Sequence, residues 1–291
     1  MAVRVVTDST SYLPDEERER YGIEVVTLYV SFGDESYPEI GLDNEWFYAR
    51  MDSESDVPTS SQPSVQNMAE VFTAAVERGE EVCGVFISAE MSGTLESAEL
   101  AATMVRESHP DARIELVDSR SNCMQLGFAV LEAARTASAG ATLDEVAAAA
   151  RGTIGRTRFL FVPHTLDYLR KGGRIGGASA LLGALLQIRP VLTVADGRTE
   201  VWGKVRTKRR ALEEMVRTLE ADVSRAGLAE AVVHHIRDEA GGQVLAEMVA
   251  SATGSEVPVI AIGAVIGLHV GPGTVGVAYR TERDIAEGVS A

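Results

Sequence analysis

The sequence predicts an α/β protein of two domains, the first with a parallel sheet covered by helices and the second with a mixed sheet. In the first half, short and continuously apolar strands alternate with helical stretches, which is typical of a parallel sheet with both faces covered. After about Thr157 the pattern changes, and Asp196-Gly197 between two apolar runs predicts a β-hairpin. Because a hairpin pairs antiparallel strands, we expect a mixed sheet there and place the domains at residues 1–156 and 157–291.

In the first domain, apolar runs predict the strands and apolar residues at helical spacing predict the helices. The expected strands are residues 3–7, 23–30, 82–87 and 114–117. The expected helices are residues 14–21, 42–51, a helix from Val65, a helix from Leu95, and residues 124–137 and 143–154. Residues 57–64, with a proline near each end, are expected to form a polar loop, and Ser64 is expected to cap the helix that follows.

The second domain is predicted by the same criteria. The expected strands are residues 159–162, 191–194, 199–205, 231–236, 257–262 and 274–279. The expected helices are residues 164–170, 178–187, 212–223 and 244–252. The helix of residues 178–187 is nearly uncharged and is expected to stop before Pro190.

Composition excludes several classes of function. The net charge of −16 argues against a nucleic-acid backbone or an anionic membrane as the main partner. No stretch approaches the apolar length of a membrane span, so integral membrane association is not expected. The two cysteines, Cys83 and Cys123, have no zinc-like spacing and no evident partner, which favours a reduced, cytoplasmic compartment.

The stretch Ser92-Gly93-Thr94 lies where the strand of residues 82–87 turns into a helix. The first turn of a helix carries backbone N–H groups without intrahelical partners and the positive end of the helix dipole. Gly93 allows a ligand to approach the backbone, and the Ser92 and Thr94 hydroxyls add donors. The turn is therefore a candidate anion site, and an ordinary Ser or Thr helix cap is the alternative.

Polar residues also end two other strands of the first domain, as Asp8-Ser9 and Asp118-Ser119. Ligands of open α/β sheets bind beyond the carboxyl ends of the strands. Because residues 88–94 follow a third strand, we expect three polar strand ends at one edge of the sheet.

Five motifs, in order along almost the whole chain, resemble those of the DegV family of fatty-acid-binding proteins. They are Asp8-Ser9, Pro58-Thr-Ser-Ser-Gln-Pro-Ser64, Ser92-Gly-Thr-Leu-Glu-Ser-Ala98, Leu169-Arg-Lys-Gly-Gly-Arg-Ile175 and Ile262-Gly-Ala-Val-Ile-Gly-Leu-His-Val-Gly-Pro-Gly273. The resemblance implies a Rossmann-like N-terminal domain, a second α/β domain with a mixed sheet, and a long-chain fatty acid of the palmitate or oleate class between the two. Some family members carry the acyl group for a bacterial fatty acid kinase, so a kinase catalytic subunit is the implied candidate partner, with phospholipid synthesis downstream.

The resemblance also implies site residues. The implied carboxylate-binding residues are Ser60, Ser61, Ser92, Gly93, Thr94 and His269, and the additional candidates are Thr59, Asp8, Ser9 and Arg174. The family usually has Thr where this chain has Ser60, so the hydroxyl is kept and a packing methyl is lost. Because residues 59–61 all carry hydroxyls, the register of the binding serine stays open. The family's common Lys before the proline is Arg189 here, which preserves the charge.

The acyl tunnel is expected along the nearly uncharged stretch after Arg174. Its implied lining residues are Leu181, Leu182, Leu185, Leu186 and Ile188. Burial of a methylene group contributes about 0.8 kcal/mol, so a long tail supplies most of the affinity while the hydroxyls orient the carboxylate. The alternative for this stretch is a plain core helix.

Three histidines and Arg174 are further candidates for ligand or metal binding. His269, in a Gly-rich stretch, is either a head-group contact or a structural hydrogen-bonding residue. Arg174 is either an anion contact or the donor of a structural bond. His234 and His235 are neighbours on an expected strand, so they point to opposite faces and cannot bind one metal together. We predict no metal, no cofactor besides the bound acid and no catalytic residue.

Two enzyme classes are alternatives to lipid binding. A serine hydrolase would use Ser92 as nucleophile, His269 as base and Asp8 or Asp118 to orient the base. The Gly-x-Ser-x-Gly turn of α/β hydrolases is absent around Ser92, which argues against it. A nucleotide-binding enzyme ranks last, because neither the Rossmann glycine pattern nor a Walker A loop is present.

A basic cluster is the expected docking surface for a kinase subunit. It consists of Lys204, Arg206, Lys208, Arg209 and Arg210. In a chain of net charge −16, such a cluster attracts an acidic surface and speeds encounter. A solvated helix start is the alternative.

Overall fold

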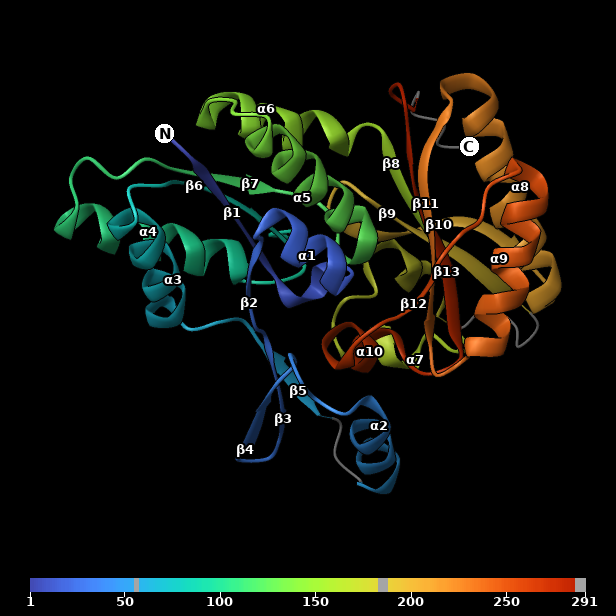
Figure 1. The fold of residues 1–291 in the computed structure, drawn as a ribbon. Helices are drawn as coiled ribbons and strands as arrows, with labels where there is room; N and C mark the ends of the chain where they lie inside the picture. Colours follow the sequence, from blue (N-terminus) through green and yellow to red (C-terminus); the bar gives the residue numbers. More distant parts are fainter. Residues whose placement is uncertain (55–57, 183–187, 286–291) are drawn as a thin grey trace. The chain divides into compact units, whose positions relative to one another are not determined.

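The structure, a computed structural model, describes residues 1–54, 58–182 and 188–285. The chain divides into two units, Met1–Ile154 (unit 1) and Gly155–Ala291 (unit 2). Each unit has its own sheets and its own buried core (Figure 1). The predicted fold class, with one parallel sheet and one mixed sheet among helices, is confirmed.

Unit 1 is built on a sheet of four parallel strands. They are β1 (Val3–Asp8), β2 (Glu24–Val26), β6 (Glu81–Phe86) and β7 (Ile114–Asp118), in the order β2-β1-β6-β7. Every residue of β6 is buried, as expected for a central strand of a parallel sheet covered on both faces.

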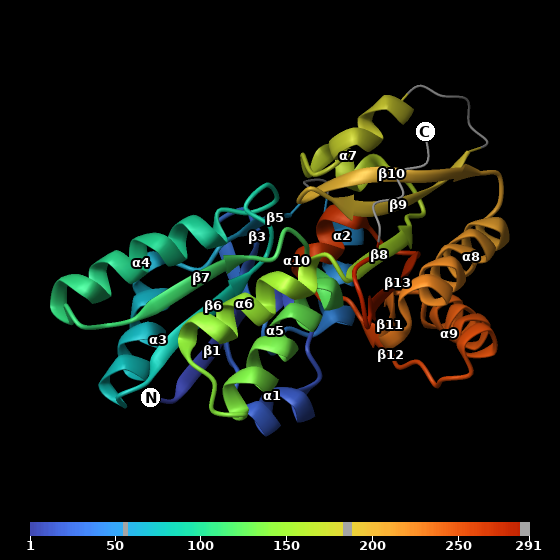
Figure 2. The ribbon, with the colours of Figure 1, turned by 90° about the horizontal axis from the view of Figure 1, so that it is seen from above.

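Helices cover both faces of this sheet. The helices of unit 1 are η1 (Ser9–Ser11, a 3₁₀ helix), α1 (Asp15–Tyr21), α2 (Asn44–Ser53), α3 (Val65–Glu77), α4 (Thr94–Ser108), α5 (Cys123–Ser138) and α6 (Leu143–Ile154). The helices α3 and α4 lie on one face and α5 and α6 on the other (Figure 2). Phe72 of α3 and Ala98 of α4 are fully buried in the core against the sheet. Ser64 caps α3 as predicted, since its Oγ accepts a bond of 3.1 Å from the Asn67 amide.

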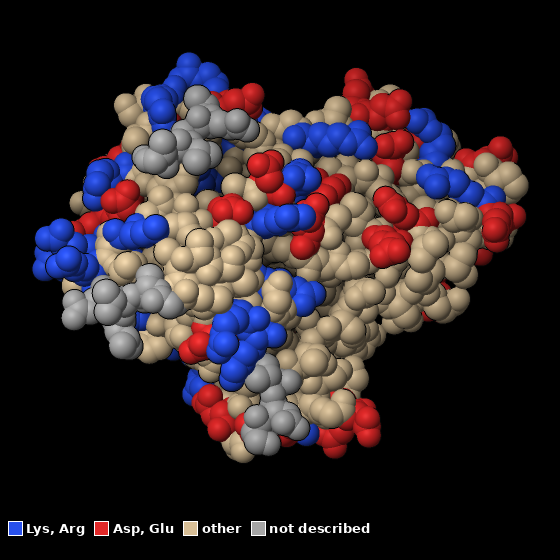
Figure 3. All heavy atoms as spheres, turned by 180° about the vertical axis from the view of Figure 1, so that it is seen from behind, with Lys and Arg blue, Asp and Glu red and all other residues tan. Residues whose placement is uncertain are grey.

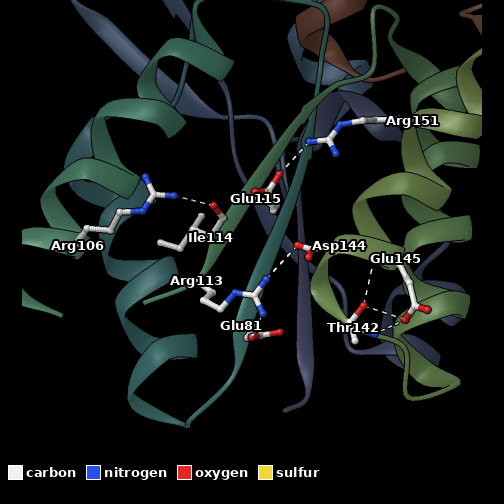
Figure 4. A network of polar contacts seen from close by, with 9 residues as sticks. All are labelled: Glu81, Arg106, Arg113, Ile114, Glu115, Thr142, Asp144, Glu145 and Arg151. Atoms are coloured by element: carbon white, nitrogen blue, oxygen red, sulfur yellow. Dashed lines mark hydrogen bonds and ion pairs between the residues drawn. The ribbon is translucent and has the colours of Figure 1, made fainter. Parts of the chain in front are cut away.

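The outer strand β7 is tied to its neighbours by ion pairs (Figure 4). Arg113, just before β7, lies 3.0 Å from Glu81 of β6 and 3.0 Å from Asp144 of α6. Arg151 of α6 lies 3.0 Å from Glu115 of β7. Partly exposed pairs of this kind contribute at most about 1 kcal/mol each, so their main effect is to orient α6 on the strand.

A second, three-stranded sheet in unit 1 contradicts two sequence predictions. Its strands are β3 (Tyr29–Phe32), β4 (Glu35–Pro38) and β5 (Thr59–Ser61), in the order β4-β3-β5. The single strand predicted for residues 23–30 is wrong, because the chain leaves the parallel sheet after Val26. There the Leu28 N–H donates to Ser9 Oγ at 3.0 Å and the Leu28 carbonyl accepts from the Glu39 amide at 2.9 Å. The loop predicted for residues 57–64 contains β5.

Unit 2 is built on a mixed sheet of six strands. They are β8 (Thr157–Val162), β9 (Arg189–Ala195), β10 (Arg198–Val205), β11 (Leu228–Ile236), β12 (Val259–Ala261) and β13 (Thr274–Thr281), in the order β10-β9-β8-β13-β11-β12. The pairing of β11 with β12 is parallel and the other pairings are antiparallel. The predicted hairpin joins β9 to β10 through Asp196 and Gly197, whose φ angles of 48° and 79° suit a tight hairpin turn.

The helices of unit 2 include two long ones that pack on its sheet (Figure 1). The helices are α7 (Asp167–Lys171), η2 (Gly176–Leu181, a 3₁₀ helix), α8 (Lys208–Ala226), α9 (Glu239–Thr253) and α10 (Ala264–Val270). Met215 of α8 and Leu245 of α9 are fully buried against Leu160 and Val275 of the sheet.

The helix predicted for residues 178–187 is wrong over its described part. The chain forms the short η2 and turns at Leu182. Gly176 lies against β10, where a Cβ at this position would be 2.2 Å from the Thr199 carbonyl oxygen, and its φ is +50°. The close approach of the Gly176 backbone to β10 requires a left-handed backbone conformation, which an α-helix does not have. The spacing of apolar residues in the sequence does not reveal this contact. Leu185 and Leu186 lie outside the described residues.

Candidate functional site in unit 1 and the motif residues of unit 2

The three polar strand ends of unit 1 lie together at the carboxyl edge of the parallel sheet. Asp8 Oδ2, at the end of β1, accepts a 2.7 Å bond from the Ile87 amide beyond β6. The Ser119 amide beyond β7 donates to the Phe86 carbonyl at 3.0 Å, and the Ser88 amide donates to the Ser121 carbonyl at 2.9 Å. Hydrogen bonds between these loops therefore hold the carboxyl edge of the sheet together without a ligand.

Backbone strain also gathers at this edge. Tyr12 follows β1, and Arg120 and Cys123 follow β7, with φ angles of 47°, 53° and 51°. A non-glycine residue in this region costs of order 1–3 kcal/mol, and such residues cluster at functional sites. The strain supports the sheet edge as the functional side of unit 1.

Asp8 and Ser9 serve the fold. Asp8 is fully buried, and its Oδ1 accepts bonds from the amide and the hydroxyl of Thr10 at 2.9 and 2.5 Å. Burial raises the pKa of Asp8, while its bonds to Thr10 and Ile87 oppose that shift. Ser9 Oγ donates to Glu39 at 2.5 Å and accepts from the Leu28 amide. These contacts disfavour both residues as ligand contacts.

The same geometry argues against the hydrolase. Asp8 uses both carboxylate oxygens on Thr10 and Ile87, as above. Asp118 Oδ1 accepts from the Arg120 amide at 2.7 Å and, more weakly, from the Ala89 amide at 3.4 Å. Both acids thus accept hydrogen bonds from backbone amides of the sheet edge, whereas a catalytic triad needs an acid that orients a histidine.

The Ser92-Gly93-Thr94 turn begins α4. Ser92 Oγ and Thr94 Oγ1 are 2.9 Å apart, and the Thr94 amide points at Ser92 Oγ at 3.3 Å. Thr94 is fully buried, whereas Ser92 and Gly93 are half-buried. Gly93 occupies the N-cap position of α4 and brings no side-chain acceptor for the first amides of the helix. Ser92 is therefore the hydroxyl of this turn that a ligand can reach.

The strand β5 decides how the serines of the 58–64 motif point. Ser60 pairs with Val30 and Ser61 pairs with Tyr29 of β3. Since successive strand residues face opposite sides, Ser60 and Ser61 cannot bind one carboxylate from the same face. Ser60 is half-buried and shares a face with the fully buried Val30, whereas Thr59 and Ser61 are exposed on the other face. The strand pairing therefore favours Ser60 over Ser61 as the inward hydroxyl.

Gln62 joins the two motifs of unit 1. A Cβ placed on Gly93 would lie 2.9 Å from Gln62 Nε2 and 3.2 Å from its amide carbon, so the Gln62 side chain packs on Gly93. The segment that carries Ser60 therefore lies against the turn that carries Ser92. Gln62 is not among the site residues that the resemblance implies, although its place between Ser61 and Pro63 in the second motif is a signal for it.

Two motifs also meet inside unit 2. His269 of α10 packs against Gly172, where a Cβ would lie 2.3 Å from His269 Nδ1. Burial and the nearby Arg174 guanidinium lower the pKa of His269 to about 4, so its ring is neutral at pH 7. Arg174 is exposed, and its Nη1 donates to the Gly172 carbonyl at 2.7 Å. The structure thus brings His269 and Arg174 together as a pair.

The described tunnel residues are solvent-accessible within unit 2. Leu182 and Ile188 are 44% and 40% exposed, and Leu181 is half-buried. Exposed leucine and isoleucine side chains near η2 are what an acyl-binding wall would offer, whereas a plain core helix would bury them.

The basic cluster is partly neutralised by neighbouring acids. Lys208 forms an ion pair with Asp238, and Arg209 Nε lies 3.0 Å from Glu213. Across the face drawn in Figure 3, basic and acidic side chains lie next to one another. The electrostatic attraction of this cluster for an acidic partner is therefore weaker than the attraction of five cations without neighbouring acids would be.

Within the described part of the chain, no helix combines the length and the apolar character that a membrane crossing requires. Among these same residues, His, Cys, Asp and Glu side chains nowhere gather in threes as a cation site would need.

Comparison with known proteins gives the family. The model of the uncharacterised DegV family matches residues 2–282. A DegV domain-containing protein of Clostridium acetobutylicum is 48% identical over 285 residues, covering 98% of this chain and 100% of that protein. A Thermus thermophilus DegV family protein, described for its fatty acid binding, has a TM-score of 0.89 and 35% identity, covering 97% of this chain and 100% of that one. A stearic acid-binding protein of Eubacterium ventriosum has a TM-score of 0.88 and 26% identity, covering 96% of this chain and 98% of that one. The chain belongs to the DegV family.

Proposed function

We propose that the protein binds a long-chain fatty acid of the palmitate or oleate class and that the Ser92-Gly93-Thr94 turn, with Ser60, binds its carboxylate. The observation that carries the proposal is the packing of Gln62 on Gly93, because it places two motif segments with accessible hydroxyls side by side. The fatty acid binding of the Thermus thermophilus relative and the stearic acid binding of the Eubacterium ventriosum relative support the ligand class.

The chemistry of the turn suits a carboxylate. When the Thr94 hydroxyl donates to Ser92 Oγ, the Ser92 proton is left to donate to the ligand. The first amides of the fifteen-residue helix α4 and its dipole add favourable interactions with an anion. We propose that Gln62 contributes its amide beside Gly93, and that His269 and Arg174 of unit 2 serve the same ligand.

The tail supplies most of the affinity. At about 0.8 kcal/mol per methylene, an acyl chain of about fourteen methylenes contributes of order 11 kcal/mol before the ordering costs of binding. A hydrogen bond to the charged carboxylate adds about 1.5–3 kcal/mol. For the tail we propose Leu181, Leu182 and Ile188 as wall residues. We further propose that the protein presents the acid to a fatty acid kinase.

The direct test is mass spectrometry of lipid extracted from protein purified from a bacterial host. We expect one long-chain fatty acid per protein, and uptake of added palmitate or oleate after delipidation. If no lipid is found and neither acid binds, the proposed function is wrong.

Replacing Ser92 with alanine should weaken fatty-acid binding by about 1.5–3 kcal/mol, roughly ten- to a hundred-fold, because a bond to a charged group is lost. Ser60→Ala should act in the same direction, and the double variant should prefer methyl esters over acids relative to wild type. Titration of one acid and its methyl ester measures both effects. The matched control is Ser61→Ala on the opposite face of β5, which should bind like wild type. Equal acid and ester preference in wild type and both serine variants would show that Ser92 and Ser60 are only structural.

A further inference from the structure

We propose that the groove between α3 and α4 is a docking surface for a basic amphipathic helix of a partner protein. The groove has a volume of about 330 Å³. Its lining residues include Ala69, Glu70, Ala74, Glu77, Met104 and Val105. It lies on the face of the parallel sheet that α3 and α4 cover. Its lining residues are not among those proposed to bind the lipid.

The charge of the two helices selects a cationic partner. Glu70 and Glu77 of α3 line the groove. The exposed Glu96, Glu99 and Glu107 of α4 lie outside its lining and add negative charge to the surrounding surface. The one basic residue in the two helices is Arg106, and its guanidinium donates to the Ile114 carbonyl at 2.7 Å, so it turns toward β7. A surface with this charge attracts Lys and Arg side chains and repels phosphate groups.

Apolar side chains make the surface more than an acidic patch. Met104 lines the groove and is 43% exposed, and Leu100, one turn earlier on α4 and outside the lining, is 53% exposed. Ala69 and Val105 form a buried floor at 6% and 1% exposure. An amphipathic helix with apolar residues at spacings of three and four fits such a groove, and its flanking cations would meet the glutamates.

A neighbouring hollow extends the same surface across α3. It has a volume of about 410 Å³ and shares Glu70 and Ala74 with the groove. Its other acidic residue is Glu24 of β2, which lies 3.7 Å from Arg78 at the end of α3, so its charge is partly neutralised. No Lys or Arg is among the lining residues of this hollow. A second copy of this chain would have to offer its own basic cluster, but Lys208 and Arg209 there are already ion-paired. The charge complementarity therefore favours a different protein as the occupant.

The test uses the full chain and a fluorescent helical peptide of about 18 residues, five turns long, with Leu at helical spacing on one face and Lys on the other. Fluorescence anisotropy measures its affinity for wild type and two groove variants, Glu70→Lys with Glu77→Lys and Leu100→Ser with Met104→Ser. The matched control is Glu16→Lys with Glu19→Lys, which changes the charge equally on the exposed face of α1.

We expect saturable 1:1 binding, a loss of at least about tenfold in each groove variant and a change below about threefold in the control. Circular dichroism of each variant checks that the helices are intact. Equal weakening in the control and in the glutamate variant would overturn the proposal, since net charge alone would then explain binding. If wild type self-associates in sedimentation and Glu70→Lys with Glu77→Lys abolishes this, the occupant is a second copy and the partner proposed here is wrong.

Discussion

Replacing Asp222 with alanine is expected to lower the free energy of unfolding of unit 2 by about 3–5 kcal/mol, because it leaves a buried charge without its partner. Asp222 is 2% exposed, and its Oδ2 accepts from Arg158 Nε at 2.8 Å and from the Tyr279 hydroxyl at 2.6 Å. Its Oδ1 accepts from Arg225 at 2.6 Å. In the variant, the largely buried Arg158 would lose its ion pair with Asp222. Its guanidinium carbon lies over the Trp202 ring, 4.3 Å from the ring centre.

The two tryptophans make the measurement specific. Trp202 belongs to unit 2 and lies on Arg158, whereas Trp46 belongs to unit 1. Urea unfolding followed by fluorescence in a Trp46→Phe background therefore reports on the unit that contains Asp222. The control is Glu220→Ala on the exposed side of the same helix, which should change stability by less than about 0.5 kcal/mol. A loss below about 1 kcal/mol in Asp222→Ala would show that Arg158 reaches water when its partner is removed.

Acid should destabilise unit 2 through His234. This side chain is fully buried, its Nδ1 lies 3.1 Å from the Ile260 carbonyl oxygen, and its ring lies edge-on to Phe159. Burial lowers the pKa of His234 to about 4 in the folded protein, against about 6.5 in the unfolded chain. Between these values the unfolded state binds more protons, so the stabilisation is complete above pH 6.5 and is lost as the pH falls toward 4.

The expected loss from His234 alone is about 3 kcal/mol across that window. His234→Gln keeps an amide that can donate to the Ile260 carbonyl and does not titrate. The difference in unfolding free energy between wild type and this variant should therefore change by that amount between pH 7 and pH 4. Carboxylates titrate in both proteins and cancel in the difference, as does His269, whose pKa is also lowered to about 4. A difference that does not change with pH would mean that His234 stays accessible to protons in the folded state.

Local patterns in the chain predicted most of the fold. The helix expected at residues 143–154 is the observed α6, and the Asp196-Gly197 hairpin joins β9 and β10 as expected. Both predictions rest on interactions within a few residues, either amphipathic spacing or a turn that needs positive φ, so the local sequence contains the information. The five motifs likewise predicted the DegV family, which the family match over residues 2–282 confirms.

The tertiary structure decided which motif residues can act together. Ser60 and Ser61 look equivalent in the sequence, but pairing with β3 turns them to opposite faces. Gln62 reaches Gly93 and His269 reaches Gly172 across long stretches of chain. The orientation of the serines depends on strand pairing, and the two side-chain contacts depend on glycines that leave space for them. A local sequence pattern contains neither kind of information.

What the sequence by itself determined, then, is the alternation of strands and helices, the mixed second sheet, the family and the set of candidate residues. Only the tertiary structure separated Ser92 and Ser60, whose hydroxyls are half-buried at the site, from Asp8 and Ser9, which hold the loops of the sheet edge together. The physical reason is that Asp8 and Ser9 are buried and accept or donate hydrogen bonds that hold the loops of unit 1 together. Asp8 bonds to Thr10 and Ile87, and Ser9 bonds to Glu39. Because Ile87 and Glu39 are distant in the sequence from Asp8 and Ser9, no local pattern predicts these bonds.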